Sequence, residues 1–328
     1  MTFKLAQKAY KRAARIPLAS LNYYLGNYEN PIWVTGDGRS GTTWLLDLIN
    51  WHGKYRVLFE PFHPQFVKAL QGYEFFQYLR VEERDSDLEV FLRSVFSGKF
   101  KNVRSDTSQI RLFYEGLLVK DIFSNLMLPW VNHNLPSVKK VLVIRNPFAS
   151  ALSKQKKKGW TWMTDPKDFL KQKELYVDHL TPFEEIISTV GDDFIERQVL
   201  IWAIVHYVPF KYLSQKDICI LFYEKLAIDT EQQLKMLFRF LTDKSSDDEI
   251  FLNGKILEKI SKPSRTSGKA SGSNLMRGQD PVKSWLNELS TQQIDRGMEI
   301  LHTFGLSDIY GTNALPNKDV LQSTGLMI

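Results

Sequence analysis

Three glycines, an arginine and two threonines stand together in the stretch Gly36-Asp37-Gly38-Arg39-Ser40-Gly41-Thr42-Thr43. Glycines let backbone N–H groups turn inward on an anion, and the N-terminus of a following helix adds partial positive charge. The spacing matches a Walker loop, but a threonine follows the last glycine where a nucleoside triphosphatase has lysine. The cation, Arg39, lies inside the loop instead. This arrangement favours a ligand with one 5′ anion whose bridging oxygen needs a nearby cation; the alternative is an ordinary turn.

The elements around this stretch must hold it in place. The apolar run over 32–35 predicts a buried strand, and apolar residues recur at helical spacing over 44–49. Runs over 55–59, 117–122, 138–146 and 217–223 predict four more strands, with helices expected over 65–100, 184–213 and 234–241. We predict an α/β fold: one three-layer domain over 31–312, P-loop-like, with a central parallel sheet flanked by helices. A basic N-terminal helix over 1–30 and a tail over 313–328 flank it.

A second cation stands where a nucleoside triphosphatase would have an acid. The strand over 138–146 closes with Arg145, whereas a Walker B strand ends in Asp or Glu for Mg²⁺. No metal is therefore expected. Arginine offers a planar, permanently charged fork for a phosphate, and Ser153 adds a hydroxyl from the following helix. The alternative for a lone arginine at a strand end is a structural ion pair.

Two segments resemble a known family. GRSGTTWL resembles the 5′-phosphosulfate loop of the sulfotransferases, which use 3′-phosphoadenosine 5′-phosphosulfate (PAPS), and RNPFASALS resembles their 3′-phosphate signature. Cytosolic members usually have lysine at the position of Arg39, whereas many carbohydrate and tyrosylprotein members have arginine. The resemblance implies PAPS as the sulfuryl donor, with 3′,5′-diphosphoadenosine (PAP) as product. It implies these donor-binding residues: Gly38, Arg39, Ser40, Gly41, Thr42, Thr43, Trp44, Arg145, Ser153, Tyr223, Ser264 and Arg265.

Some of these residues rest on weaker likenesses. Tyr223 closes a strand in a Tyr-Glu-Lys-Leu segment that resembles the one beside adenine in sulfotransferases, and Trp44 is the other implied adenine neighbour. Either ring could be core instead. Ser264 and Arg265 lie in the Gly-, Ser- and Lys/Arg-rich stretch 261–279, which resembles the family's late loop over the 3′-phosphate. The cytosolic Arg-Lys-Gly pattern is not present there in order, and an exposed linker is the alternative.

The loop after the second predicted strand contains two candidates for a catalytic base. Glu60 and His63 each precede a proline there, and loops at the carboxyl ends of parallel strands line the ligand crevice. Sulfuryl transfer to a hydroxyl needs a base, and either side chain could serve. The Phe-Glu-Pro segment resembles that of carbohydrate-type sulfotransferases, so we favour Glu60 over His63 as the base. A helix cap and a surface histidine are the alternatives.

Four side chains are candidates for contact with the acceptor: Phe62, His63, Asp121 and Trp160. Asp121 ends the third strand and could orient an acceptor or make a structural salt bridge. The lysine that precedes it belongs to a Lys-x-His pattern in cytosolic sulfotransferases, but the histidine is absent here. The lysines at 154 and 156–158 form either a solvated helix end or a basic entrance for an anionic donor or glycan. Trp160 could stack on a sugar or anchor a loop.

The predicted reaction is in-line transfer of a sulfuryl group from PAPS to an acceptor hydroxyl, on a glycan or glycolipid by the resemblance. Glu60 would remove the proton, and Arg39 would stabilise charge on the bridging oxygen and the leaving phosphate. Thr42, Thr43 and backbone amides would hold the 5′ group. The alternatives are a P-loop nucleotide kinase, which would turn over Mg²⁺·ATP, and a non-catalytic nucleotide- or glycan-binding module.

Composition sets broader limits. The 328 residues carry a net charge of +6, which suits an anionic ligand and is too weak to indicate nucleic acid. One cysteine, Cys219, excludes an intrachain disulfide, and there is no N-glycosylation sequon. Both favour a cytoplasmic setting. No apolar run reaches the length of a membrane span. The basic N-terminal helix is expected to pack on its own domain, with peripheral membrane contact as the alternative.

Overall fold

A sheet of five parallel strands forms the centre of the computed structural model, in the order β2-β3-β1-β4-β5. The structure describes residues 17–84, 86–106, 111–157, 160–214, 216–242, 256, 260 and 280–317. The strands are β1 (Ile32–Thr35), β2 (Tyr55–Phe59), β3 (Gly116–Lys120), β4 (Lys139–Ile144) and β5 (Cys219–Phe222). The prediction of a central parallel sheet is confirmed. Strand order reverses at β1, and such a switch point is where open α/β sheets bind ligands.

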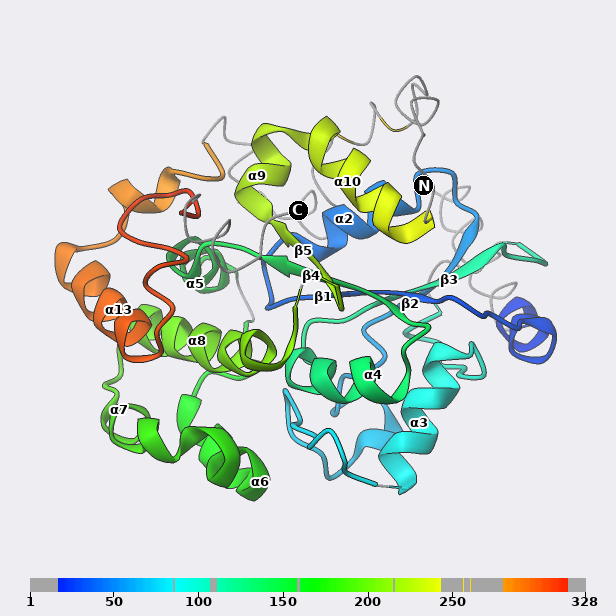
Figure 1. The fold of residues 1–328 in the computed structure, drawn as a ribbon, viewed down its shortest axis with the longest axis horizontal. Helices are drawn as coiled ribbons and strands as arrows, with labels where there is room; N and C mark the ends of the chain where they lie inside the picture. The colour runs from blue at the N-terminus through cyan, green and yellow to red at the C-terminus, as the bar shows by residue number, and fades with distance from the viewer. Residues whose placement is uncertain are drawn as a thin grey trace, which may run out of the picture.

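Helices cover both faces of the sheet, which Figure 1 shows nearly edge-on. The helices are α2 (Thr42–Ile49), α3 (Ser86–Phe96), α4 (Leu128–Asn134), α5 (Pro147–Gln155), α6 (Lys173–Leu175), α7 (Glu184–Thr189), α8 (Phe194–Tyr212), α9 (Tyr223–Ile228), α10 (Thr230–Thr242) and α13 (Thr291–Thr303). In Figure 1, α2, α9 and α10 lie on one face of the sheet, and α3, α4 and α8 lie on the other. The fold is therefore the predicted three-layer α/β arrangement.

Alternating strand residues supply the two cores. Along β1, Ile32 and Val34 pack with α2 and α10, whereas Trp33 packs with residues of α3, α4 and α8. This alternation follows from the pleat, which sends successive side chains to opposite faces. Cys219 belongs to the first of these cores and is fully buried, as predicted, and burial raises the pKa of its thiol to about 12. It is an inert packing residue in this environment.

Two predicted helices differ from the observed structure. Residues 65–84 form turns and the short helical turn η1 (Lys68–Leu70), and α3 is the α-helix that the described residues form in the predicted range. Gly72 and Phe76 have φ of 97° and 54° there, and left-handed residues cannot continue a right-handed helix. The helix expected over 184–213 is two helices, α7 and α8. Asp193 caps the start of α8 by accepting a hydrogen bond from the N–H of Glu196.

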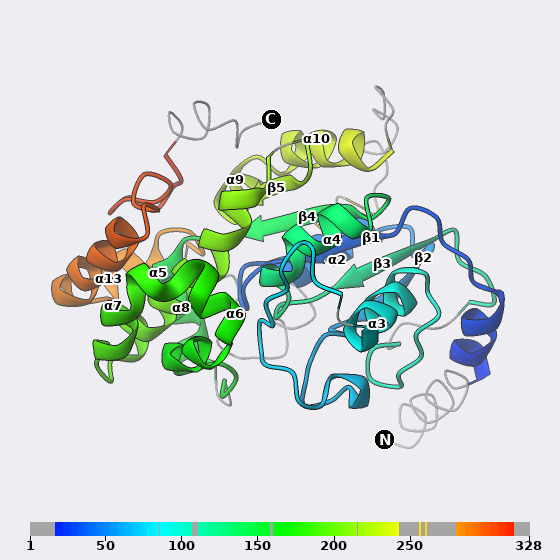
Figure 2. The same cartoon turned by 60° about the horizontal axis from the view of Figure 1, so that its bottom comes forward.

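The described part of the N-terminal segment lies at the β2 edge of the sheet. Residues 17–25 are helical, and the Asn22 carbonyl accepts a hydrogen bond from Arg56 of β2. Figure 2 shows this helix beside α3. The basic residues before position 17 lie outside the described residues. Within the described residues, no helix has both the length and the apolar character that crossing a membrane requires.

Candidate active site

The loop between β1 and α2 is packed so closely that its glycines have no room for a side chain. A Cβ on Gly38 would lie 2.1 Å from the ring of Trp160, and one on Gly41 would lie 2.6 Å from Tyr223. Gly41 also has a φ of 99° and is the N-cap of α2. No side chain caps the helix, and no acid stands in its first turn. The first amides of α2 are therefore available to an anion.

A buried ion pair holds this loop to α5. Lys154 Nζ lies 2.6 and 2.8 Å from the two carboxylate oxygens of Asp37, and it donates to Gln198 Oε1 at 2.9 Å. Asp37 Oδ1 also accepts from the N–H of Gly38 at 2.7 Å. These contacts satisfy all three ammonium protons away from water. Lys154 is therefore neither a solvated helix end nor a basic entrance, and both alternatives for it were wrong.

Breaking this pair should destabilise the fold. Removing one partner of a buried ion pair leaves an uncompensated buried charge, which typically costs about 3–5 kcal/mol. We expect Lys154→Met to lower the free energy of unfolding by that amount in urea titration and to weaken PAP binding. Lys171→Met is the control because its pair with Asp168 is on the surface, where such pairs contribute about 0–1 kcal/mol. Equal stability of the two variants would contradict this role for Lys154.

The predicted donor-binding cations meet next to the loop. Arg39, with a φ of 72°, donates from Nε to Ser153 Oγ at 3.1 Å. Arg145 donates from Nη1 to the Arg39 carbonyl at 2.9 Å, and its guanidinium lies 4.5 Å from the ring centroid of Tyr223. Burial, and next the charge of Arg145, lowers the pKa of Arg39. Two cations held this close, in a site of low dielectric, form a field that favours an anion between them.

The aromatic residues predicted beside adenine also lie together. The rings of Trp44 and Tyr223 are 6.0 Å apart in an edge-on arrangement. Tyr223 is mostly buried against Gly41 and Arg145, so it is a wall of the loop as well as a strand-end residue. These contacts bring Trp44, Arg39, Arg145, Ser153 and Tyr223 to one place, although they come from three separate parts of the chain.

The second group of predicted residues follows β2 and β3. Glu60 Oε1 accepts from Lys120 Nζ at 2.7 Å, and the Glu60 N–H donates to the Lys120 carbonyl at 2.6 Å. Lys120 is buried, whereas the side chain of Glu60 retains 13% exposure. Glu60 has a φ of 51°. Sequence reasoning missed this pairing, because it depends on the register of β2 and β3, in which Phe59 lies opposite Lys120.

The Asp121 carboxylate holds the loop after β2 through hydrogen bonds to backbone N–H groups. Its Oδ2 accepts from the Phe62 N–H at 2.9 Å and its Oδ1 from the Phe123 N–H at 2.7 Å. The carboxyl group is fully buried, and burial raises its pKa to about 7. Neither oxygen is engaged with a cation in the described structure, so the geometry is that of a backbone brace. Phe62 itself is buried in the core beside Trp33.

His63 lies in an aromatic surround beside this loop. Its ring centroid is 4.2 Å from that of Phe66, 5.0 Å from that of Phe123 and 5.7 Å from that of Trp162. Neither ring nitrogen has a hydrogen-bond partner among the described residues, although the side chain is buried. Buried polar atoms are rarely left unpaired, so both nitrogens have hydrogen-bonding capacity that a water or a ligand could take up. Trp160 packs on Trp162 with centroids 5.3 Å apart, which connects the donor loop to the rings around His63.

We expect His63 to stay neutral at physiological pH. Burial, and next the charge of Arg104, lowers its pKa to about 4, from an ordinary value near 6.5. The unfolded chain therefore binds a proton between about pH 6.5 and pH 4 that the folded chain does not, and this residue's contribution to stability falls as pH falls through that window. The imidazole NMR resonance, assigned by its loss in His63→Phe, should not move between about pH 8 and pH 5. Titration with a midpoint near 6.5 would contradict this environment.

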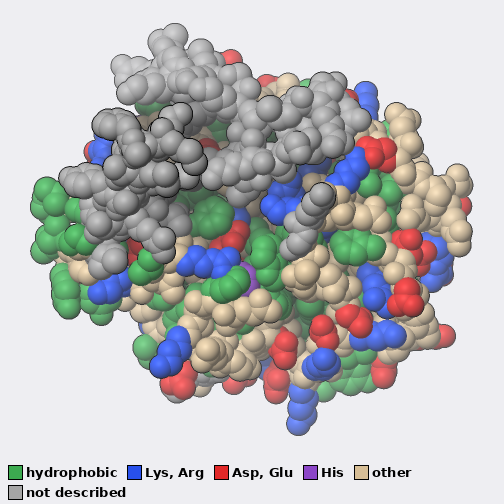
Figure 3. All heavy atoms as spheres, turned by 180° about the vertical axis from the view of Figure 1, so that it is seen from behind, with side chains coloured by type: hydrophobic (Ala, Val, Ile, Leu, Met, Phe, Trp, Pro, Cys, Tyr) green, Lys and Arg blue, Asp and Glu red, His purple; other side chains and the backbone are tan. Residues whose placement is uncertain are grey.

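The carboxyl ends of the strands around β1 thus carry three groups. They are the β1–α2 loop, the cations Arg39 and Arg145, and the pair of Glu60 with Lys120. Lys157 lies within electrostatic reach of these groups. Burial is the main cause of its lowered pKa, and the charges of Arg39, Glu60 and Lys120 also affect that pKa. Figure 3 shows one face of the molecule, on which Lys and Arg side chains are interspersed with hydrophobic and acidic ones. The family comparison agrees with this arrangement: a sulfotransferase domain matches residues 29–303. The chain belongs to the sulfotransferase family.

Several solved structures match this chain at low sequence identity. A mouse sulfotransferase complexed with PAP is 15% identical, with 89% of this chain and 90% of that chain covered and a TM-score of 0.42. The sulfotransferase domain of the curacin biosynthetic pathway is 14% identical, with 85% and 99% covered and a TM-score of 0.43. Retinol dehydratase in complex with androsterone and PAP is 15% identical, with 88% and 84% covered and a TM-score of 0.39. No curated protein matches the sequence significantly.

The residues of this sulfotransferase fit a doubly anionic nucleotide. Ser40 Oγ, Arg145 Nε and Ser150 Oγ are buried without hydrogen-bond partners in the described part of the chain. All three atoms can donate hydrogen bonds, and they lie in the β1–α2 loop, directly after β4 and in the first turn of α5. An anion could accept these hydrogen bonds. No group of three His, Cys, Asp or Glu side chains that could hold a metal ion occurs among the described residues. Ser264 and Arg265 lie outside the described residues, so their predicted contact with the 3′-phosphate stays a prediction.

Proposed function

We propose that this sulfotransferase moves the sulfuryl group of PAPS to a hydroxyl of a glycan or glycolipid, with Glu60 as the base and Arg39 stabilising the leaving group. One observation carries the proposal: Glu60 and Arg39 follow β2 and β1, the two strands that pair with β3 on either side, and their charges act on the same lysine, Lys157. A base for the acceptor and a cation for the donor are thereby held at one site.

The backbone supports these two assignments. Only four non-glycine residues in the described structure have positive φ, and Arg39 and Glu60 are two of them. Such conformations cost about 1–3 kcal/mol each and persist where the surroundings fix them, which is often at active sites. Here the fixing contacts are the hydrogen bond from Arg145 to the Arg39 carbonyl and that from the Glu60 N–H to Lys120.

Each residue would contribute one part of the reaction. The amides of α2, with Thr42 and Thr43, would bind the 5′ group, and Arg145 with Ser153 would bind the 3′-phosphate. Glu60 would accept the hydroxyl proton as the oxygen attacks, and Lys120 would orient the carboxylate. Arg39 would balance negative charge as it develops on the leaving phosphate. PAPS supplies the activated sulfuryl group.

The proposal of a glycan acceptor rests on Arg39 and the Phe-Glu-Pro segment, which resemble those of carbohydrate-type sulfotransferases. The cytoplasmic location and the membrane contact of the N-terminal helix stay predictions. The test is to incubate the protein with ³⁵S-labelled PAPS and fractionated cell extract, and to identify by mass what gains a sulfate. Labelled glycan or glycolipid supports the proposal. Label confined to small phenols, or PAP binding without any transfer, contradicts it.

A further inference from the structure

Arg104 is a cation beside Glu60 that the transfer chemistry leaves without a role. Its guanidinium carbon lies 3.4 Å from the ring centroid of Phe66. The charge of Glu60 acts on Arg104, and that of Arg104 acts on His63, so the three groups share one neighbourhood. Burial lowers the pKa of Arg104 while Glu60 opposes that change. Within the described structure, the guanidinium has no hydrogen bond or ion pair, although it is half-buried.

The backbone that carries Arg104 is tightly held. The N–H groups of Arg104 and Ser105 both donate to Asn102 Oδ1, at 2.8 and 3.3 Å, which closes a turn. The Ser105 carbonyl accepts from the N–H of Phe59, the last residue of β2, at 2.9 Å. The turn is therefore attached to the strand that ends immediately before Glu60.

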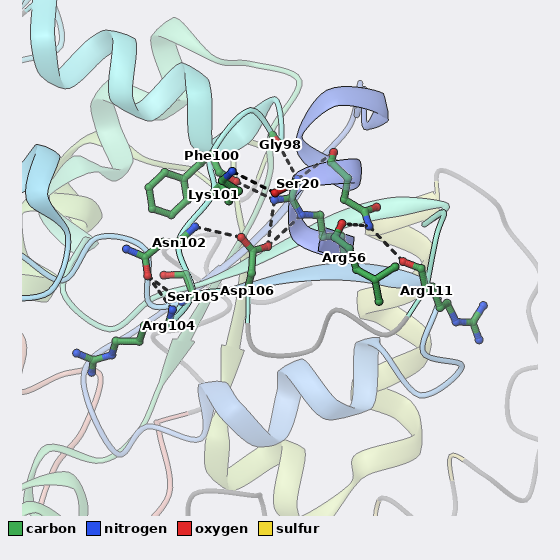
Figure 4. A network of polar contacts seen from close by, with 12 residues as sticks. Ser20, Arg56, Gly98, Phe100, Lys101, Asn102, Arg104, Ser105, Asp106 and Arg111 are labelled. Atoms are coloured by element: carbon green, nitrogen blue, oxygen red, sulfur yellow. Dashed lines mark hydrogen bonds and ion pairs between the residues drawn. The ribbon is translucent and has the colours of Figure 1, made fainter. Parts of the chain in front are cut away.

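A buried ion pair fixes the other end of this turn. Asp106 Oδ1 accepts from Arg56 Nε and Nη2 at 3.2 and 3.0 Å, and both side chains are buried. Arg56 also donates to the carbonyls of Gly98 and Phe100, at 2.6 and 2.7 Å. Figure 4 shows this network, with the Arg104 side chain pointing away from it. A rigid support therefore presents one unpaired guanidinium, which is the preorganisation that a binding group needs.

The sheet order separates Arg104 from the donor. Donor-binding residues follow β1, β4 and β5, whereas Arg104 is attached to β2, at the opposite edge from β5. The cation whose charge acts on Arg39 is Arg145, and Arg104 is not among the groups that affect Arg39. Arg104 therefore lies on the acceptor side of Glu60, away from the nucleotide.

We propose that Arg104 binds an anionic group, a carboxylate or a sulfate, carried by the acceptor glycan near the hydroxyl that is sulfated. This inference rests on the proposed glycan acceptor. A guanidinium is the side chain best matched to such groups, because its planar fork can donate two parallel hydrogen bonds. Near Glu60, Lys157 and Arg104 form no ion pair with a carboxylate of the described residues, while Glu60 is already paired with Lys120. The local field thus favours an acidic acceptor over a neutral one.

Calorimetry with PAP present tests this proposal through binding alone. The probes are a chondroitin hexasaccharide, its carboxyl-reduced form, and keratan-type hexasaccharides with and without sulfate, which separate carboxylate from sulfate. Wild-type protein should prefer one anionic probe over its neutral match by about tenfold or more, the value of a charge-assisted hydrogen bond. Arg104→Ala should remove that preference, Arg104→Lys should keep part of it, and Arg93→Ala on the surface of α3 should keep all of it.

The outcomes separate the two proposals. If wild-type protein binds anionic and neutral probes equally, or if Arg104→Ala keeps the preference, the role of Arg104 is wrong. If labelled PAPS gives no sulfated glycan at all while PAP still binds, the proposed function fails first. If glycans are sulfated and Arg104→Ala lowers kcat/KM equally for acidic and neutral acceptors, only the inference about Arg104 fails.

Discussion

Arg39→Ala is expected to lower kcat by about 10²–10³-fold, the usual cost of removing one preorganised group that stabilises transition-state charge. The affinity for PAP should fall less, because helix amides and Arg145 also face the donor. The loss should appear in kcat since the charge on the bridging oxygen grows only as the bond to sulfur breaks. Arg39→Lys should recover much of the rate, because a point charge remains at the position where cytosolic relatives carry lysine.

Steady-state kinetics with an acceptor found by the labelling experiment, and PAP titration by calorimetry, check this expectation. Arg93→Ala is the charge-matched control on an exposed helix face. Ser153→Ala is a sharper comparison because Ser153 accepts the hydrogen bond from Arg39 Nε. If Arg39→Ala and Ser153→Ala weaken PAP binding equally and leave kcat alone, Arg39 is a 3′-phosphate ligand and not a leaving-group cation. Normal turnover by Arg39→Ala would exclude both roles.

The strands could be predicted because each is a short apolar run that needs no knowledge of its neighbours. Residues 32–35 and 55–59 are β1 and β2 with the predicted bounds. Helix boundaries were harder, since the separation of α7 from α8 depends on a cap at Asp193 and on a short loop. The donor loop was readable because its glycines and arginine act through adjacent backbone, which is local in sequence.

The partners of the site residues could not be predicted. Lys154 lies in a run of lysines that looked solvated, and its partner Asp37 is 117 positions away. Lys120 and Glu60 are 60 positions apart and meet only because β2 and β3 are neighbours in register. Charge signs in a sequence therefore indicate which groups are available, whereas burial and strand order decide which of them pair. This is why Glu60 could be proposed as a base while its orienting lysine was missed.

Glu60→Gln is expected to lower kcat by about 10²–10⁴-fold, the range that general-base catalysis contributes. Glutamine has the same shape and can still accept the hydrogen bond from Lys120, but it cannot take a proton from a hydroxyl at neutral pH. PAP binding should be unchanged, because the donor-binding residues follow other strands. Glu115→Gln is the matched control, since its pair with Lys54 is exposed and lies at the start of β3, away from the site.

Lys120 must be taken into account when the Glu60→Gln variant is interpreted. Glu60→Gln leaves a buried ammonium without its carboxylate, so a loss of rate could come from a disturbed fold. Glu60→Gln combined with Lys120→Met removes that charge, and the rate should stay low in the double variant while its unfolding free energy recovers. His63→Phe distinguishes the other candidate base. If it abolishes transfer while Glu60→Gln retains it, the proton goes to the neutral imidazole of His63 and Glu60 serves only to orient Lys120.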